Sequence, residues 1–148
     1  MIYADASFLV SLCLSDVNSA KAVATMKRHA TPITLTAIQK HELRNALRLA
    51  VWRSRQERSP VTVAEATEAL ARSDARIAAG EFIEHPLSLR QTMNEAERIG
   101  ALHTMTLGVR GMDLLNVAAA VVIGAKIFLT FDLRQRTVAQ ACGLIVGP

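Results

Sequence analysis

The sequence predicts an α/β protein in which a mostly parallel sheet of four to five strands is flanked by helices. Short apolar runs alternate with segments of helical periodicity along the whole chain, and this alternation is typical of parallel sheets. Residues that favour helix N-termini follow directly after several of the apolar runs. No linker, internal repeat or low-complexity tract divides the 148 residues, so we expect a single domain over residues 1–148.

The first half of the chain alternates strand and helix signals. Asp5 and Thr36 each follow an apolar run and are suited to cap the helix that comes next. Pro32 ends a helical segment because it lacks the backbone N–H that a helix needs. Leu43 and Leu47 recur at the spacing of one buried helix face. We therefore expect strands at 1–5 and 33–35, and helices opening at 5–7 and spanning 19–29 and 37–54.

The second half follows the same pattern. Gly124 and Gly143 mark helix ends, because glycine is the usual residue just past a helix C-terminus. The short apolar run that follows Gly124 has the length of a buried strand. In order, we expect a helix at 62–79, a strand at 82–83, a helix at 88–101, a loop at 103–111, a helix at 113–124, a strand at 126–131, a helix at 133–141 and a strand at 144–146.

The composition excludes several classes of protein. Apolar residues make up 51% of the chain and charged residues 20%, which argues against a disordered protein. The longest apolar run, 117–125, is shorter than the roughly 18 residues that a membrane span needs. No basic and apolar leader follows Met1, so we expect a soluble cytoplasmic protein with no membrane partner. Cys13 and Cys142 form no metal or disulfide pattern. The net charge of +4 suits a nucleic-acid partner without requiring one.

Four carboxylates are candidates for one functional edge of the sheet. Asp5 and Asp132 follow predicted strands, and Asp113 lies in the first turn of a predicted helix. In a parallel sheet, strand carboxyl ends and helix starts share one edge. Glu42 lies just beside the buried stripe of its helix. Each acid also has an ordinary explanation, as a helix cap, a residue that favours the helix dipole, or a solvated side chain.

Their expected convergence is what points to chemistry. Crowded carboxylates raise one another's pKa, and a divalent cation relieves the repulsion. Oxygen ligands favour Mg²⁺ or Mn²⁺, and such an ion suits phosphoryl chemistry because it activates water and stabilises a leaving oxygen. Other motifs fail. No glycine-rich phosphate loop is present, and His41-Glu42 lacks the second histidine of a zinc-protease motif because Asn45 stands there.

The acids and their neighbours resemble a known family. The opening Met-Ile-Tyr-Ala-Asp5-Ala-Ser7, Glu42-Leu-Arg-Asn-Ala, Asp113 at the head of a small-residue helix, and Thr130-Phe-Asp132 with Arg134 close behind are similar to the PIN-domain ribonucleases. The compact length resembles the VapC-type toxins of toxin–antitoxin pairs. The resemblance implies a parallel sheet flanked by helices and metal-dependent endonucleolytic cleavage of RNA.

The resemblance also assigns residues. Asp5, Glu42, Asp113 and Asp132 would surround Mg²⁺ or Mn²⁺, with Ser7 and Thr130 as the supporting hydroxyl residues. Asn116 departs from the pattern, where relatives often carry another polar or an aromatic residue. The family further implies a homodimer and a small antitoxin protein as partner. The candidates for RNA phosphate contacts are arginines that would otherwise be solvated surface charges: Arg44, Arg48, Arg110, Arg134 and Arg136.

Two other functions stay open on the sequence. A binding module could keep the fold without cutting and regulate through an RNA or protein partner, although binding alone does not need all four acids. Phosphate-ester hydrolysis with Asp5 as nucleophile is the other alternative. In its best-known form that chemistry needs a second Asp two residues on, and Ser7 stands at that position. Our reading of the sequence is therefore a metal-dependent endoribonuclease acting as a toxin, with its RNA left open.

Overall fold

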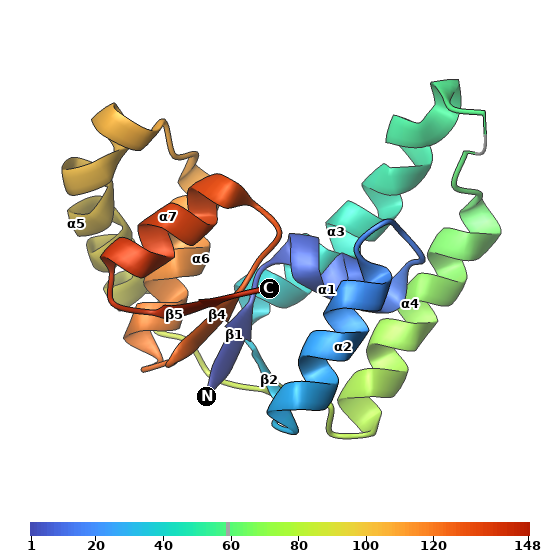
Figure 1. Cartoon of the computed structure of the whole chain (residues 1–148), viewed down its shortest axis with the longest axis horizontal. Helices are drawn as coiled ribbons and strands as arrows, with labels where there is room; N and C mark the ends of the chain where they lie inside the picture. The colour runs from blue at the N-terminus through green and yellow to red at the C-terminus, as the bar shows by residue number, and fades with distance from the viewer. Residues whose placement is uncertain (59) are drawn as a thin grey trace.

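A computed structural model describes residues 1–58 and 60–148. In these residues the chain forms one five-stranded sheet, and all four pairings between neighbouring strands are parallel. The strand order is β3-β2-β1-β4-β5, with β1 in the centre (Figure 1). This confirms the predicted α/β class. The strands are β1 (Ile2–Ala4), β2 (Ile33–Leu35), β3 (Phe82–Glu84), β4 (Ile127–Leu129) and β5 (Ile145–Gly147).

Helices cover both faces of the sheet (Figure 1). One layer contains α1 (Ala6–Cys13), α2 (Ser19–His29), α3 (Ala37–Arg53) and α4 (Val63–Ala78), with a short 3-10 helix η1 (Ser54–Gln56) after α3. The other layer contains α5 (Leu89–Leu107), α6 (Gly111–Val122) and α7 (Leu133–Ala141). No helix in the described part of the chain is both long and apolar enough to cross a membrane.

The alternation of side chains along the strands divides the core in two. Ile2 and Ala4 pack into the cluster under α1–α4, whereas Tyr3 between them packs into the cluster under α5–α7. The ring of Tyr3 stacks on that of Phe128, the neighbouring residue on β4, with ring centroids 5.5 Å apart. Burying a side chain of this size stabilises the fold by about 1.5–3 kcal/mol. The central strand is therefore held from both faces.

The chain topology brings the ends of β1 and β4 together. From β1 the chain moves outward through β2 to β3, then returns to β4 on the other side of β1 and continues to β5. The strand order thus reverses between β1 and β4, and in open parallel sheets ligands bind at the carboxyl ends of the strands at such a point. Asp5 directly follows β1, and Thr130 directly follows β4. The backbone N–H of Asp5 donates to the carbonyl of Leu129 at 3.0 Å, which locks the two strand ends side by side.

The largest error in the predicted boundaries is at the end of α5. The loop expected at 103–111 is helical as far as Leu107, so α5 is longer than predicted. The helix continues because no residue before Gly108 breaks it. Gly108 then adopts the left-handed conformation, with φ of 62°, that ends helices at glycine. Only residues 108–110 connect α5 to α6, and this short connection places Asp113 close to the end of α5.

Candidate functional site

Asp5 is the buried centre of the candidate site. It is the N-cap of α1, and one carboxylate oxygen accepts from the backbone N–H of Phe8 at 3.0 Å and from the hydroxyl of Ser7 at 2.7 Å. The other oxygen accepts from the hydroxyl of Thr130 at 2.8 Å and from the side-chain amide of Gln135 at 3.0 Å. The side chain is only 1% exposed. Capping accounts for the contact with Phe8 alone, so three of the four hydrogen bonds lie beyond the ordinary role of a cap.

The two supporting hydroxyl residues join Asp5 to the chain that leads to Asp132. The Ser7 hydroxyl accepts from the backbone N–H of Phe131 at 2.9 Å. The Thr130 hydroxyl accepts from the backbone N–H of Asp132 at 2.9 Å while it donates to Asp5. Both side chains therefore connect the end of β1 to the segment after β4. The family resemblance had suggested Ser7 and Thr130 as supporting residues without these contacts.

Asp132 is the N-cap of α7. One of its carboxylate oxygens accepts from the backbone N–H groups of Arg134 at 2.7 Å and Gln135 at 3.0 Å. No hydrogen bond occupies its second oxygen among the described residues. Asp132 lies near Asp113, whose pKa it helps to raise by charge repulsion. Asp132 is therefore both a helix cap and a partly exposed carboxylate at the functional edge.

Gln135 links two of the predicted acids and was not among the predicted site residues. It lies in the first turn of α7 with only 4% of its surface exposed. Its side-chain amide nitrogen donates to Asp5 at 3.0 Å and to Asp113 at 3.1 Å. No sequence signal distinguished this glutamine from an ordinary helix residue. Its position three residues after a capping aspartate is the feature that could have suggested it.

Asp113 reaches the same edge from α6. Besides the contact with Gln135, its second carboxylate oxygen accepts from the backbone N–H of Arg110 at 3.4 Å and completes the N-terminal cap of α6. Partial burial raises the pKa of Asp113, and the charge of Asp132 raises it further. The backbone hydrogen bond and the guanidinium groups of Arg110 and Arg134 act in the opposite direction. On balance the pKa of Asp113 is raised.

Glu42 is held at the edge by a buried pair of polar side chains. The Asn116 amide nitrogen donates to the Glu42 carboxylate at 2.7 Å and to the carbonyl of Met112 at 3.2 Å. The Asn116 amide oxygen accepts from the hydroxyl of Tyr3 at 2.9 Å. Tyr3 and Asn116 are both fully buried. Asn116 is therefore a buried residue that orients Glu42 toward the edge. Tyr3 was not among the predicted site residues.

Burial raises the pKa of three of the four acids. Desolvation is the largest cause for Asp5, Glu42 and Asp113, and for Asp5 it raises the pKa to about 6. Repulsion adds to it: Glu42 raises the pKa of Asp5, and Asp113 raises that of Glu42. Hydrogen bonds from Ser7 to Asp5 and from Asn116 to Glu42 act against the shift. Perturbed carboxylates of this kind cluster at functional sites.

The donor chemistry of the site fits a hard divalent cation. Every candidate ligand atom is a carboxylate or hydroxyl oxygen, which are the ligands that Mg²⁺ and Mn²⁺ prefer. The amide oxygen of Gln135 is buried and has no hydrogen-bond partner. Within residues 1–58 and 60–148, however, no three His, Cys, Asp or Glu side chains are grouped closely enough to hold one ion. The side-chain amide of Gln135 joins Asp5 to Asp113, and that of Asn116 binds Glu42.

The arginines proposed for phosphate contacts differ in how freely they can bind. Arg44 pairs with Asp74 at 2.6 Å, and the Arg136 guanidinium donates to the carbonyls of Thr130 and Pro148. Arg134 donates weakly to the carbonyl of Gly108 at 3.4 Å. Arg48 and Arg110 are exposed, and no side chain among the described residues forms an ion pair with either. Arg48, Arg110 and Arg134 are therefore the more accessible candidates.

A groove begins at Glu42, the one candidate acid that lines it, and runs between α1 and α3. Its volume is about 560 Å³, and Ser7 and Glu42 line the end nearest the site. Apolar side chains such as Val10 and Leu49 form much of its wall, with Asn45 and Arg53 as polar groups. The groove is open and reaches past the end of α3.

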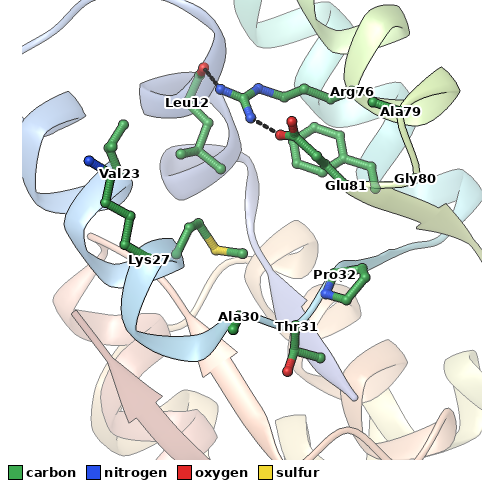
Figure 2. A pocket seen from close by; sticks show the side chains of 12 residues that line it. Leu12, Val23, Lys27, Ala30, Thr31, Pro32, Arg76, Ala79, Gly80 and Glu81 are labelled. Atoms are coloured by element: carbon green, nitrogen blue, oxygen red, sulfur yellow. Dashed lines mark hydrogen bonds and ion pairs between the residues drawn. The ribbon is translucent and has the colours of Figure 1, made fainter.

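A second cavity of about 490 Å³ lies at the amino-terminal ends of β2 and β3 (Figure 2). Pro32 and Phe82, which precede and begin strands β2 and β3, line it together with α2 and the end of α4. Arg76 bonds there to the carbonyl of Leu12 and to the Glu81 carboxylate (Figure 2). No candidate site residue lines this cavity, so it plays no part in the chemistry of the acids.

The fold and the site define an α/β domain with an acid-lined edge at the point where the strand order reverses. No family model matches the chain, and no curated protein matches its sequence. Solved structures do match its fold. The crystal structure of VapC20 from Mycobacterium tuberculosis, a sarcin-ricin loop cleaving toxin, superposes with a TM-score of 0.66 over 98% of this chain and 97% of that chain at 15% identity.

Two further structures match over the full length. FitAcB from Neisseria gonorrhoeae has a TM-score of 0.61 at 16% identity and covers 100% of this chain and 97% of that chain. VapBC2 from Rickettsia felis, solved bound to a DNA fragment from its promoter, has a TM-score of 0.64 at 14% identity and covers 99% and 97%. The chain therefore has the VapC-type PIN-domain fold that the sequence suggested. At these identities the likeness establishes the fold alone.

Proposed function

We propose that this protein is a Mg²⁺- or Mn²⁺-dependent endoribonuclease and the toxin of a toxin–antitoxin pair. The observation that carries the proposal is the junction of Asp5 and Asp113 through Gln135 at the reversal point of the sheet. Two carboxylates from distant segments, both with raised pKa, share one donor in a buried position. Burying carboxylates costs folding free energy, so this arrangement is better explained by a cation site than by a purely structural role. The fold shared with a toxin that cleaves the sarcin-ricin loop adds support.

The residues of the chain divide into two roles. Asp5, Asp113 and Asp132 would hold the cation directly or through water, and Glu42 would complete the set. A cation bound there supplies a positive charge that activates water and stabilises the leaving oxygen. Ser7 and Thr130 fix the Asp5 carboxylate, and Asn116 fixes Glu42. None of these supporting groups needs to touch RNA.

The reaction would be an in-line displacement at phosphorus. The water oxygen bonds to phosphorus as the bond to the 3′ oxygen breaks, which leaves a 5′ phosphate and a 3′ hydroxyl. Glu42 is suited to orient the water and to take up its proton, because it is only partly buried and its raised pKa lies closer to neutrality than that of a free carboxylate. Arg48, Arg110 and Arg134 would contact the RNA phosphates from the exposed rim.

The toxin role rests on the fold. The similar structures include two with the VapC name, and a small antitoxin would block the acids by filling the groove that reaches Glu42. We also propose a homodimer, as the family resemblance implies. The RNA class is not defined by the groove: transfer, ribosomal and messenger RNA would all reach the edge as single strands.

Cleavage of total cellular RNA by the purified protein tests this function. The reaction is run with Mg²⁺, with Mn²⁺ and with chelator, beside the variants Asp113→Asn and Asp74→Asn. Asp74 is the matched control, since it pairs with Arg44 outside the acid network. We expect discrete metal-dependent fragments with the wild type and Asp74→Asn, and none with Asp113→Asn. Absence of cleavage by folded, partner-free, metal-loaded wild type would favour the non-cleaving binding module instead.

A further inference from the structure

The Gln135 carboxamide lies between the two carboxylates that the proposed function assigns to the cation. Its nitrogen is 3.0 Å from an Asp5 oxygen and 3.1 Å from an Asp113 oxygen. The two acceptor oxygens are therefore no farther apart than the sum of these lengths. Chemistry fixes the orientation of the amide, because its oxygen in the same place would face two acceptors. The nitrogen thus bridges the carboxylates with both of its hydrogens.

Only these two hydrogen bonds hold the carboxamide in place. Its oxygen is buried and has no partner, so turning the group breaks no further bond within the described residues. An unmet buried acceptor is unfavourable, which makes the present orientation less favourable than a fully satisfied one. The donors are nevertheless well placed, since each of the two hydrogen bonds ends on a carboxylate oxygen. The amide nitrogen thus bridges two carboxylates, whereas the amide oxygen has no hydrogen-bond partner among the described residues.

A cation that binds both carboxylates needs the space that the nitrogen holds. Mg²⁺ takes its oxygen ligands at about 2.0–2.1 Å, and an ion at that distance from both oxygens lies between them. The nitrogen and the ion cannot occupy this point together. Hydrogen bonds from the amide and coordination by the ion also draw on the same carboxylate oxygens. Direct coordination of one ion by both carboxylate oxygens would therefore exclude the present amide bridge.

We propose that the Gln135 carboxamide is a placeholder for the cation. In the ion-free protein it bridges Asp5 and Asp113 and reduces their repulsion, and it turns away when the cation enters. This inference rests on the proposed function, because it requires a cation at the acids. It adds a positioning residue that sets the affinity for the ion and keeps the ion-free site assembled. The amide competes with the cation and is not one of its ligands.

The first test measures Mn²⁺ affinity by electron paramagnetic resonance for the wild type, Gln135→Ala and Gln140→Ala. Gln140 is exposed on the same helix and is the matched control. Removing two hydrogen bonds present only in the ion-free state should lower the Mn²⁺ dissociation constant of Gln135→Ala at least about fivefold. The thermal midpoint in chelator should fall for Gln135→Ala alone. An unchanged or higher dissociation constant overturns the placeholder.

A second test uses the unmodified protein and does not depend on how the variant folds. The side-chain NH₂ resonances of Gln135 are followed by ¹H–¹⁵N NMR during a Mg²⁺ titration. We expect these signals to shift and to exchange faster with water as the ion binds, while those of Gln140 stay fixed. Wild type that binds the ion with no change at Gln135 overturns this inference and leaves the proposed function standing. Wild type that binds neither Mg²⁺ nor Mn²⁺ overturns both.

Discussion

Tyr3 and Asn116 are joined by a buried 2.9 Å hydrogen bond although they are 113 positions apart in the chain. The bond runs from the hydroxyl of a residue on the central strand to the amide oxygen of a residue on α6. Because this bond fixes the amide, the nitrogen of Asn116 faces the carboxylate of Glu42 at 2.7 Å. A side chain in the core thus sets the direction of an acid at the functional edge.

This link predicts that Tyr3→Phe alters the pH dependence of cleavage. The substitution keeps the stacked ring but leaves the Asn116 oxygen buried without a donor, which should cost about 1–3 kcal/mol of unfolding free energy. It also loosens the Asn116 bond that lowers the pKa of Glu42. The acidic limb of the rate–pH profile should therefore move to higher pH. A profile that matches the wild type, in a variant with the expected stability loss, would limit Tyr3 to a packing role.

The raised pKa of Asp5 predicts how stability depends on pH in the ion-free protein. The folded pKa is about 6 and the ordinary value is 3.8, so the folded state binds the proton more tightly. The contribution of Asp5 protonation to the free energy of unfolding is fully present below pH 3.8, and it is lost as pH rises to about 6. The total loss from Asp5 is at most about 3 kcal/mol. The pKa values of Glu42 and Asp113 are also raised, so their contributions to stability are likewise lost as pH rises.

Urea unfolding in chelator, at several pH values from 4 to 7.5, measures this dependence. The free energy of unfolding should fall with pH in the wild type and fall less in Asp5→Asn, which carries no titratable group at that position. Saturating Mg²⁺ should restore most of the loss above pH 6, since the cation would offset the buried charges. Equal slopes for the wild type and Asp5→Asn would show that the Asp5 proton does not govern this range.

Much of the fold follows from local sequence signals. Thr36 and Thr62 cap α3 and α4 through complete capping boxes, and the apolar alternation of the strands matches the two-sided burial of the sheet. The end of α5 was harder to predict, because nothing at residues 103–107 distinguishes a helix from a polar loop. Gly108 was the available signal, and its left-handed conformation shows that the helix runs up to it.

The candidate site was predictable only in part. Asp5 and Asp132 follow predicted strands, so topology placed them on one edge, whereas Ser7 and Thr130 were suggested by the family resemblance. Gln135 and Tyr3 each reach the candidate site through a long-range hydrogen bond, Gln135 to Asp5 over 130 positions and Tyr3 to Asn116 over 113. No spacing rule connects residues that meet only through the sheet order. A buried glutamine or tyrosine also has many ordinary explanations, and only the geometry separates them.

The two roles of Asp132 can be separated by two substitutions. Asp132→Asn keeps an oxygen that can accept from the backbone N–H groups of Arg134 and Gln135, whereas Asp132→Ala removes the cap. Loss of an N-cap typically costs about 0.5–2 kcal/mol, so only the alanine variant should show a clear drop in thermal midpoint in chelator. Both variants should lose cleavage if the charge serves the cation. A cleaving Asp132→Asn would reduce Asp132 to a cap.

Arg48 is the arginine for which phosphate binding is most readily tested. It is exposed and has no ion-pair partner among the described residues, whereas Arg44 on the same helix is already paired with Asp74. If Arg48 contacts a phosphate, Arg48→Ala should weaken binding of single-stranded RNA and reduce the slope of log affinity against log salt by about 0.7. Arg44→Ala should change the slope less, because its charge is partly neutralised in the free protein. Fluorescence anisotropy in the Asp113→Asn background, which we expect not to cleave RNA, measures both slopes. An unchanged slope for Arg48→Ala would remove Arg48 from the RNA-binding surface.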